Sequence, residues 1–495
     1  MAEAKQATAP QGAAITADAF EALLAKEFKP KTDRARAEVE GAVRTLAEQA
    51  LRESTVVSDD VIGTIKAIIA EIDKKLSDQL NVVMHSERFQ QLESAWRGLN
   101  YLVSNTETDE MLKIRVMNIS KKDLAKTLKK YKGVAWDQSP IFKRLYEQEY
   151  GQLGGEPYGC LVGDYYFDHT PGDVELLGQI AQTAAAAHAP FLAAAAPALM
   201  GMDSWQELAN PRDLAKIASA PDYAAWRSLR DSDDAKYIGL AMPRFLSRVP
   251  YGPSTNPVEE FDFEEETGAG NHKNYTWTNA AYAMAVNVNR SFKDYGWCTS
   301  IRGVETGGGV ESLPVHTFPS DDGGVDMTCP TEIAISDRRE MELANSGLMP
   351  LIHRKNTDVA AFIGAQSLQK PQEYTDPDAT ANARLAARLP YLFASCRFAH
   401  YLKCMVRDKV GSFMERDDMQ KYLHQWIQGY VLGDPARAGE QQKARKPLAA
   451  AEVKVEEIEG NPGFYSAVFH LRPHYQLEGV NVSMRLVSKL PSLKK

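Results

Sequence analysis

The chain has 495 residues, a formal net charge of -9, and 44% hydrophobic residues. This length exceeds what one hydrophobic core organises, so we expect two or three domains. The acidic balance disfavours nucleic acid, whose phosphates call for clustered lysine and arginine. Five scattered cysteines without a CxxC pair, no signal-peptide pattern and no membrane-spanning apolar run together favour a cytoplasmic protein with free thiols.

The N-terminal region, residues 1–60, begins with a stretch rich in Ala, Gln and Pro that we expect to be disordered. A short amphipathic helix is predicted at residues 15–28. Its apolar side chains fall near helical spacing and are Phe20, Leu23, Leu24 and Phe28. Two interpretations stay open: the stripe docks onto its own domain, or it is a recognition helix for a partner groove.

Residues 61–110 are predicted to be a helical region. Its clearest helix is "SERFQQLESAWRGLNYLV", with Ser86 as N-cap. Apolar side chains repeat there at a/d spacing and are Phe89, Leu92, Trp96, Leu99 and Val103. We expect this stripe to lie in a core or in a seam between helices.

Residues 111–375 are predicted to be an α/β core. The stretch 111–119 has the pattern of a strand, and the Lys-rich helix at 121–131 is expected to present a solvated face. Apolar strands then alternate with helices, which indicates βαβ units in a parallel or mixed sheet. The Pro-rich, acidic stretch near 250–275 is predicted to be an exposed insertion.

Residues 376–495 are predicted to combine helices with a β-hairpin, in which Tyr465, Ala467, Phe469 and Leu471 alternate toward the buried face. Pro390 marks a kink or boundary in a long helical run, and residues 433–447 read as a polar linker. The last strand alternates Val480, Val482, Met484 and Leu486 with Asn481, Ser483, Arg485 and Lys489. A strand at the chain end needs a partner for its backbone N–H and C=O groups, either in its own sheet or in another chain.

Motifs that carry catalysis are scarce. No P-loop, HExxH or GxSxG pattern is present, and the Gly-rich loop at 307–309 lacks the Lys-Ser/Thr ending of a phosphate cradle. His316, Cys329 and His353 match no zinc spacing, and the acidic runs "EEFDFEEE" and "SDDGGVD" are expected to be ordinary surface acid. We predict no catalytic, cofactor-binding or metal-binding residues.

Four long stretches together resemble one family. They are "SERFQQLESAWRGLNYLV", "NAAYAMAVNVNRSFKDYGWCTSIRGVETGGGVESLPVHTF", "TANARLAARLPYLFASCRFAHYLK" and "FHLRPHYQLEGVNVSMRLVSKLP". In sequence and order they are similar to the large subunit of the contractile sheath of the bacterial type VI secretion system. The resemblance runs from Ser86 to Pro491.

This resemblance implies a structural protein without catalysis or cofactors. The large subunit would pair with a small sheath subunit in the cytoplasm and polymerise with its own copies around inner-tube hexamers on a baseplate. Contraction would propel the tube for protein secretion, and an AAA+ unfoldase would then recycle the sheath by gripping an N-terminal helix, here residues 15–28. It implies neither nucleic-acid binding nor membrane insertion.

The resemblance also answers the question raised by the terminal strand. In the family a C-terminal arm adds to a sheet of a neighbouring large subunit, which here assigns that role to residues 480–490, including Arg485 and Lys489 on the rim. The predicted fold is therefore mixed α/β (α+β): an N-terminal helical region, a βαβ-containing core, and C-terminal helices with a hairpin and an exchanged strand. Two rival hypotheses are an α/β enzyme that binds a nucleotide or small substrate near 307–309, and a soluble adaptor that forms no polymer.

Overall fold

The computed structural model describes residues 61–210, 213–267, 272–319, 324–409, 415–457 and 465–474. These residues divide into two compact units. Unit 1 comprises 61–94, Ser247–Thr276 and Pro314–Thr328, and unit 2 comprises Ala95–Leu246, Trp277–Leu313 and the described chain from Cys329 onward.

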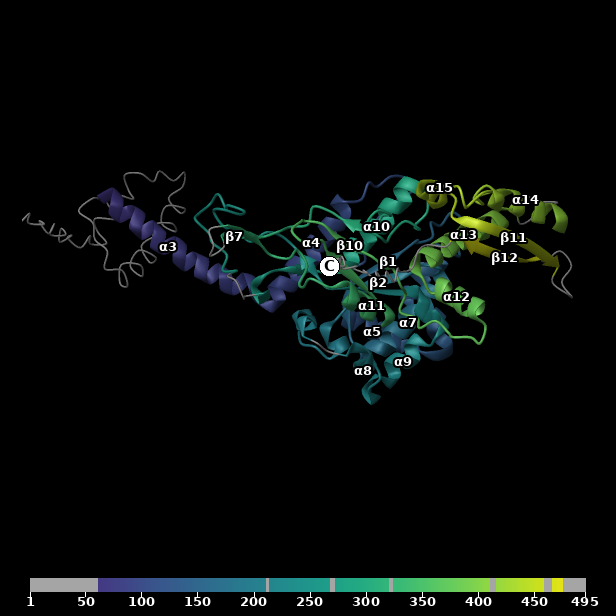
Figure 1. Cartoon of the computed structure of the whole chain (residues 1–495), viewed down its shortest axis with the longest axis horizontal. Helices are drawn as coiled ribbons and strands as arrows, with labels where there is room; N and C mark the ends of the chain where they lie inside the picture. Colours follow the sequence, from purple (N-terminus) through teal and green to yellow (C-terminus); the bar gives the residue numbers. More distant parts are fainter. Residues whose placement is uncertain are drawn as a thin grey trace, which may run out of the picture. The chain divides into compact units, whose positions relative to one another are not determined.

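Helices and short strands alternate along the described chain, as Figure 1 shows. The helices are α3 (Val61–Met84), α4 (Glu87–Ser104), α5 (Lys121–Lys130), α6 (Pro140–Phe142), α7 (Pro171–Ala187), α8 (Leu214–Ala218), α9 (Ala224–Arg230), α10 (Ala280–Tyr295), α11 (Asp337–Asn345), α12 (Pro377–Ala386), α13 (Leu389–Asp408), α14 (Arg416–Gln428) and α15 (Glu440–Arg445). The strands are β1 (Leu161–Phe167), β2 (Phe191–Ala195), β3 (Ile238–Met242), β4 (Phe245–Leu246), β5 (Trp277–Thr278), β6 (Gly309–Val310), β7 (Thr317–Pro319), β8 (Val325–Met327), β9 (Leu348–His353), β10 (Ala360–Phe362), β11 (Leu448–Glu457) and β12 (Tyr465–Pro473).

A six-stranded mixed sheet organises unit 2, in the order β1-β2-β3-β9-β10-β6. Strands β1, β2, β3 and β9 run parallel, while β10 is antiparallel to both of its neighbours. Helices α7 and α10 pack on this sheet, and Figure 1 shows them on opposite sides of β1 and β2. Because both faces are covered, the strands are apolar throughout rather than alternating. This confirms the predicted mixed α/β class.

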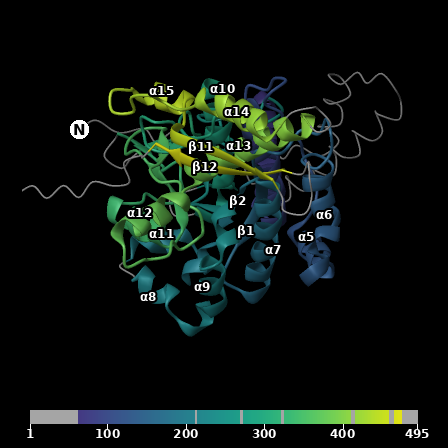
Figure 2. The same cartoon turned by 90° about the vertical axis from the view of Figure 1, so that its right-hand side faces the viewer.

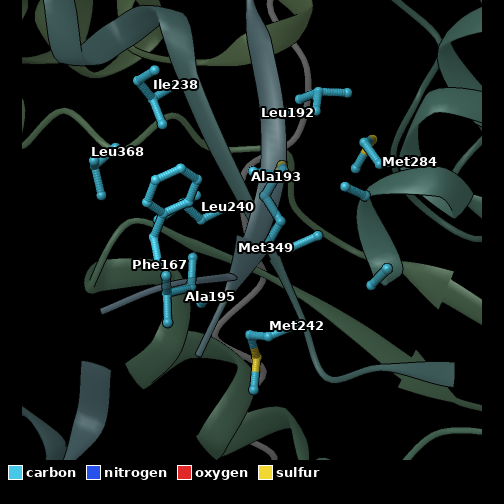
Figure 3. Close-up of a cluster of buried hydrophobic side chains, with 14 of the residues drawn as sticks. Phe167, Leu192, Ala193, Ala195, Ile238, Leu240, Met242, Met284, Met349 and Leu368 are labelled. Carbon is cyan, nitrogen blue, oxygen red and sulfur yellow. The ribbon is translucent and has the colours of Figure 1, made fainter. Parts of the chain in front are cut away.

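The core of unit 2 gathers side chains from the central strands and the helices that cover them (Figure 3). Phe167, Leu192 and Leu240 are fully buried, and Met284 of α10 closes the cluster from the helical side. A fully buried aliphatic or aromatic side chain stabilises the fold by about 1.5–3 kcal/mol. The Val/Leu/Ala-rich strands seen in the sequence are therefore the source of this core.

Strand β9 lies in the middle of the sheet, although the sequence did not predict it. It pairs with β3 through Leu240↔Leu348, Ala241↔Met349 and Met242↔Pro350. Pro350 lacks a backbone N–H and is disfavoured within a sheet, which hid the strand. The signal available in the sequence was the apolar run from Leu348 to Leu351, which is buried.

Two local predictions were wrong. Residues 111–119 form no strand; they are an extended segment held by side chains, with Lys113 Nζ 2.5 Å and Arg115 Nη2 2.9 Å from the carboxylate of Glu156. The predicted linker at 433–447 contains α15, because Ala444 is buried and so fixes one side of a short helix. By contrast, Pro390 lies in the first turn of α13, as expected of a boundary.

None of the helices in the described ranges is long and apolar enough to cross a membrane.

Candidate functional site

The two sets of predicted site residues lie outside the described residues. One is the C-terminal arm, which comprises Val480, Val482, Met484, Arg485, Leu486 and Lys489. The other is the N-terminal recognition helix, which comprises Phe20, Leu23, Leu24 and Phe28. The assembly surfaces that can be built from the structure are therefore those that such segments, or another chain, could contact.

The first surface is the two-stranded sheet of β11 and β12, which pair in antiparallel register from Leu448↔Pro473 to Glu457↔Tyr465. Figure 2 shows the hairpin lying against α13 and α14. One face of the sheet packs on a hydrophobic cluster with Phe398, Leu423 and Ile427. This confirms the predicted alternation of Ala467, Phe469 and Leu471 toward the buried face.

The outer edge of β12 carries no further strand among the described residues, since β11 and β12 are assigned to a sheet of two strands. The edge of β11 is partly occupied by α14, because the Val455 amide donates to Gln420 Oε1 at 3.1 Å and the Ala451 carbonyl accepts from Gln428 Nε2 at 3.2 Å. An isolated two-stranded sheet is marginal in water and is strengthened by added strands. An open edge presents unpaired N–H and C=O groups, which template the pairing of another chain. Among the described residues, the hairpin can therefore accept a strand at the edge of β12.

The second surface is the apolar stripe of α4, which the sequence placed in a core or an interhelix seam. A place in this chain's own core is wrong: Leu92 is 56% exposed and Trp96 is 67% exposed. The helix buries its opposite side instead, where Leu102 packs on Tyr282 and Val286 of α10. Phe89 and Val103 are exposed as well.

Small residues explain why α4 packs on α10 through the side opposite its apolar stripe. A Cβ on Gly98 would lie 2.4 Å from the Tyr282 ring, so α4 and α10 approach closely only because this position is glycine. Buried Ser94, Gly98 and Leu102 follow one another at four-residue spacing on one face of the helix. The large apolar residues lie on the opposite face, where a partner chain would cover them.

A buried ion cluster organises unit 1. The Arg248 side chain is 7% exposed, and its Nη1 lies 2.5 Å from Glu265 Oε2 while its Nε lies 2.6 Å from Glu93 Oε1. Thr276 donates its hydroxyl to Glu93 at 2.9 Å, and the Tyr251 amide donates to Glu265 at 2.9 Å. Burial lowers the pKa of Arg248, but its hydrogen bonds to the two carboxylates outweigh burial and raise that pKa above its usual value.

This cluster corrects two predictions. Glu265 belongs to the run "EEFDFEEE", which we expected to be ordinary surface acid, yet it is 5% exposed and ion-paired. The stretch 250–275 is likewise not a wholly exposed insertion, because Phe263, Glu265 and Thr267 are buried. The signal missed was the period-two pattern, which places these three side chains on one face of an extended chain.

The Gly-rich loop at 307–309 is a packed turn. The amide of Gly303 donates to the Phe362 carbonyl at 2.7 Å, and the amide of Gly308 donates to the Gly303 carbonyl at 2.9 Å. Arg290 Nη2 donates to the carbonyl oxygens of Gly307 and Gly309. Because the amides of Gly303 and Gly308 already serve backbone carbonyls, they are not free to cradle a phosphate.

A cysteine that lines a cavity of unit 2 also lacks the character of a catalytic nucleophile. A cavity of about 430 Å³ is lined by His188, Lys236, Tyr237 and Cys396, among others. Burial raises the pKa of Cys396 to about 12, which keeps its thiol protonated and a poor nucleophile. Over the described part of the chain, no group of three or more His, Cys, Asp or Glu side chains could hold a metal ion.

The three residues considered as metal ligands have other hydrogen-bond partners. His316 Nδ1 lies 2.8 Å from the Tyr275 hydroxyl. Cys329 Sγ lies 3.2 Å from the Thr331 hydroxyl, and His353 Nε2 lies 2.8 Å from the Thr357 carbonyl oxygen.

Comparison with known proteins adds independent findings. The family model "EvpB/VC_A0108, tail sheath N-terminal domain" matches residues 66–369, and "EvpB/VC_A0108, tail sheath gpW/gp25-like domain" matches residues 378–490. The "Type VI secretion system sheath protein TssC1" of Pseudomonas aeruginosa is 69% identical over 496 residues, which cover 100% of both chains.

Two solved structures resemble the fold more distantly. The anti-feeding prophage baseplate gives a TM-score of 0.34 at 12% identity, covering 64% of this chain and 65% of that one. The anti-feeding prophage helical sheath in its contracted state gives 0.28 at 13% identity, covering 62% of this chain and 66% of that one. The chain thus spans slightly less than two thirds of each, and TM-scores this low carry no structural conclusion.

Proposed function

Because this chain belongs to the family of type VI secretion system sheath proteins, we propose that it is the large structural subunit of a cytoplasmic contractile sheath. Paired with a small sheath subunit, it assembles around an inner tube and contracts to propel that tube for protein secretion. The observation that carries this proposal is the 69% identity to a sheath protein over the full length of both chains. Further proposed partners are the baseplate and an AAA+ unfoldase.

The proposed link between subunits is strand exchange. The arm at residues 480–490 of one copy adds to the β11–β12 sheet of a neighbour, and a strand of the small subunit adds to the same sheet. The edge of β12, which carries no further strand among the described residues, supports this arrangement. Val480, Val482, Met484 and Leu486 would face the neighbour's core, with Arg485 and Lys489 on the rim.

The energetics of one link are modest. An arm of this length makes about six to eight main-chain hydrogen bonds, each contributing roughly 0.5–1.5 kcal/mol net. Ordering its backbone costs about 1–2 kcal/mol per residue, which cancels much of the gain from bonds and apolar burial. Many such links in one lattice act together through effective concentration, so the polymer is strong although each link is weak.

The proposed role needs no catalysis. The packed turn at 307–309 and the protonated Cys396 thiol support a structural protein over the rival enzyme hypothesis. The exposed apolar stripe of α4 supports a chain whose working state is covered by partners. In this division of labour residues 1–60 serve recycling, 111–375 form the body of the sheath subunit, and 376–495 make the links.

Co-expression with the small sheath subunit tests the proposal. We expect hollow tubules by electron microscopy, and we expect deletion of Val480–Lys495 to abolish tubules while the two subunits still co-purify. Val482→Asp, which places a charge on the proposed buried face of the arm, is expected to weaken tubule formation. Deleting only Pro491–Lys495 is the matched control for the truncation, and Ser483→Asp on the other face of the arm is the matched control for Val482→Asp. If the truncated chain still forms normal tubules, the arm is not the link.

A further inference from the structure

Helix α5 carries a lysine stripe, which we define as Lys122, Lys126, Lys129 and Lys130. All four are exposed, on the side of the helix opposite buried Leu124 and Leu128. Their neighbours Lys121 and Lys132 have carboxylate partners at 2.6 Å, in Asp173 and Glu175. Among the residues that the structure describes, none forms a salt bridge with a lysine of the stripe.

This stripe is costly to the isolated chain. Like charges four residues apart on a helix are destabilising. Lys122 also lies in the first turn, where the helix dipole disfavours a cation, whereas Lys129 and Lys130 lie in the last turn, where it favours one. Residues 113–132 contain seven lysines and one arginine; four of these eight cations are paired with carboxylates, and the other four are the stripe. Such a concentration of charge is explained if a negative surface of another molecule covers it.

A complementary surface exists in unit 1. We define the acidic strip as Asp262, Glu264 and Glu266, which are exposed and alternate with buried Phe263, Glu265 and Thr267. Glu259 and Glu260 extend its charge. No salt bridge to these five acids is found within the described ranges.

The acidic strip is held rigidly from beneath. Glu265 is bound to Arg248, and the Asn81 side chain clamps the backbone on either side by donating to the Glu264 carbonyl at 3.2 Å and accepting from the Glu266 amide at 3.1 Å. The exposed carboxylates are thus presented in a fixed extended row, so binding a partner there costs little ordering of the backbone.

The charges of the two surfaces have matching spacing. Four residues along a helix advance about 6 Å, which separates Lys122, Lys126 and Lys130. Two residues along an extended chain advance about 6.6 Å, which separates Asp262, Glu264 and Glu266. Over three positions the two rows stay in register to within about 1–2 Å, well inside the reach of a lysine side chain.

We propose that the lysine stripe of one copy docks on the acidic strip of a second copy as a head-to-tail contact of the polymer. This inference rests on the proposed sheath function and deepens it by naming a self-interaction surface. Because the two surfaces differ, the contact is heterologous and does not pair two copies into a closed dimer, as an open helical assembly requires. Being exposed and ionic, it weakens as salt rises.

Charge reversal tests the contact in tubules formed with the small subunit. Variant A carries Lys122→Glu, Lys126→Glu and Lys130→Glu, and variant B carries Asp262→Lys, Glu264→Lys and Glu266→Lys. Each alone is expected to raise the protein concentration needed for tubules by at least about tenfold. Matched controls reverse the same charges at exposed positions without salt bridges: Lys216, Lys355 and Lys421 to Glu, and Glu110, Glu305 and Glu311 to Lys.

Mixing distinguishes a contact between copies from one within a copy. Co-expressed A and B are expected to form tubules again, because the acidic α5 of A meets the basic strip of B and the reverse. This rescue also shows that both variants fold. The contact between copies is overturned if co-expressed A and B form no tubules. It is also overturned if tubules return only when all six substitutions are placed in one chain.

Two further outcomes separate this inference from the proposed function. If the parent chain forms no tubules, the sheath function itself fails. If the parent forms tubules and both A and B form them at the parent's concentration and with the parent's salt dependence, only the docking inference fails. The controls are expected to behave as the parent does.

Discussion

At the scale of single residues, the most consequential side chain is Arg248. Its guanidinium lies between Glu93 and Glu265, both of which are mostly buried. Removing a buried cation leaves its carboxylate partners uncompensated, whereas removing a surface ion pair costs little. The acidic run around Glu265 gave no hint of burial, because charged runs are usually solvated.

We expect Arg248→Met to destabilise unit 1 by about 3–5 kcal/mol, because two carboxylates would stay buried without a counter-ion. Urea unfolding followed by far-ultraviolet circular dichroism measures the change, because unit 1 contains helix α3 but none of the seven tryptophans. Arg338→Met is the control, since its pair with Glu342 is exposed and its loss should cost at most about 1 kcal/mol. Equal losses of unfolding free energy in the two variants would show that the buried ion cluster stabilises the protein no more than a surface ion pair does.

A second residue-scale prediction concerns pH. His400 is 2% exposed, and its Nε2 lies 2.9 Å from the Ala187 carbonyl oxygen. Burial lowers the pKa of His400 to about 4; the hydrogen bond to Ala187 partly opposes this, while Arg397, His188 and Lys403 add to it. The unfolded chain binds the proton near pH 6.5, so stability is complete above that pH and falls as pH drops toward 4, by up to about 3 kcal/mol.

Chemical unfolding at pH 7 and pH 5 measures this loss. His400→Gln should reduce the pH dependence between these values, because the imidazole of His400 then no longer has to stay neutral, while burial still lowers the pKa of His188. His424→Gln removes an exposed histidine and should leave the dependence unchanged. An unaltered slope in His400→Gln would contradict the assignment.

At the scale of elements, glycine allows the left-handed backbone conformations needed in the turn before β6 and at the end of α10. Gly307 has φ +94°, and a Cβ there would lie 2.1 Å from the Ser300 carbonyl oxygen. Gly296, the C-cap of α10, has φ +78° but open space around the missing Cβ. A Cβ at Gly296 would therefore meet only the strain of a left-handed backbone, whereas a Cβ at Gly307 would meet that strain and a clash with the Ser300 carbonyl oxygen.

We expect Gly307→Ala to cost about 2–4 kcal/mol of folding free energy, because the clash with rigid backbone adds to the strain. Gly296→Ala should cost only about 1–2 kcal/mol. Thermal unfolding of the two variants provides the comparison. Indistinguishable melting temperatures would mean that the turn near β6 relaxes freely.

At the scale of the whole molecule, the proposed polymer must also be taken apart. The N-terminal residues contribute the proposed unfoldase helix, with Phe20, Leu23, Leu24 and Phe28 as its apolar face. Because this helix acts in recycling rather than in the lattice, its loss should affect disassembly and spare assembly.

Deletion of residues 1–28 is expected to leave tubule formation unchanged and to slow ATP-dependent disassembly by the AAA+ unfoldase several-fold. Light scattering of tubules mixed with the unfoldase follows the reaction. Deleting only residues 1–14 keeps the helix and should preserve the parent rate. Normal disassembly of the longer deletion would refute the assignment of the helix.

The sequence by itself determined the fold class, the family, the boundary at Pro390, and the alternation of Ala467, Phe469 and Leu471. The family follows from the resemblance of long stretches of sequence, and the other three follow from local rules of periodicity and backbone chemistry, which act within a few residues. Tertiary structure alone decided which face of α4 is buried, that Pro350 lies in a central strand, and that Glu265 is an interior ion. Each depends on a partner far along the chain: Tyr282 for Gly98, Met242 for Pro350 and Arg248 for Glu265. Local periodicity shows that a side chain could be buried, but only the packing partner determines whether it is.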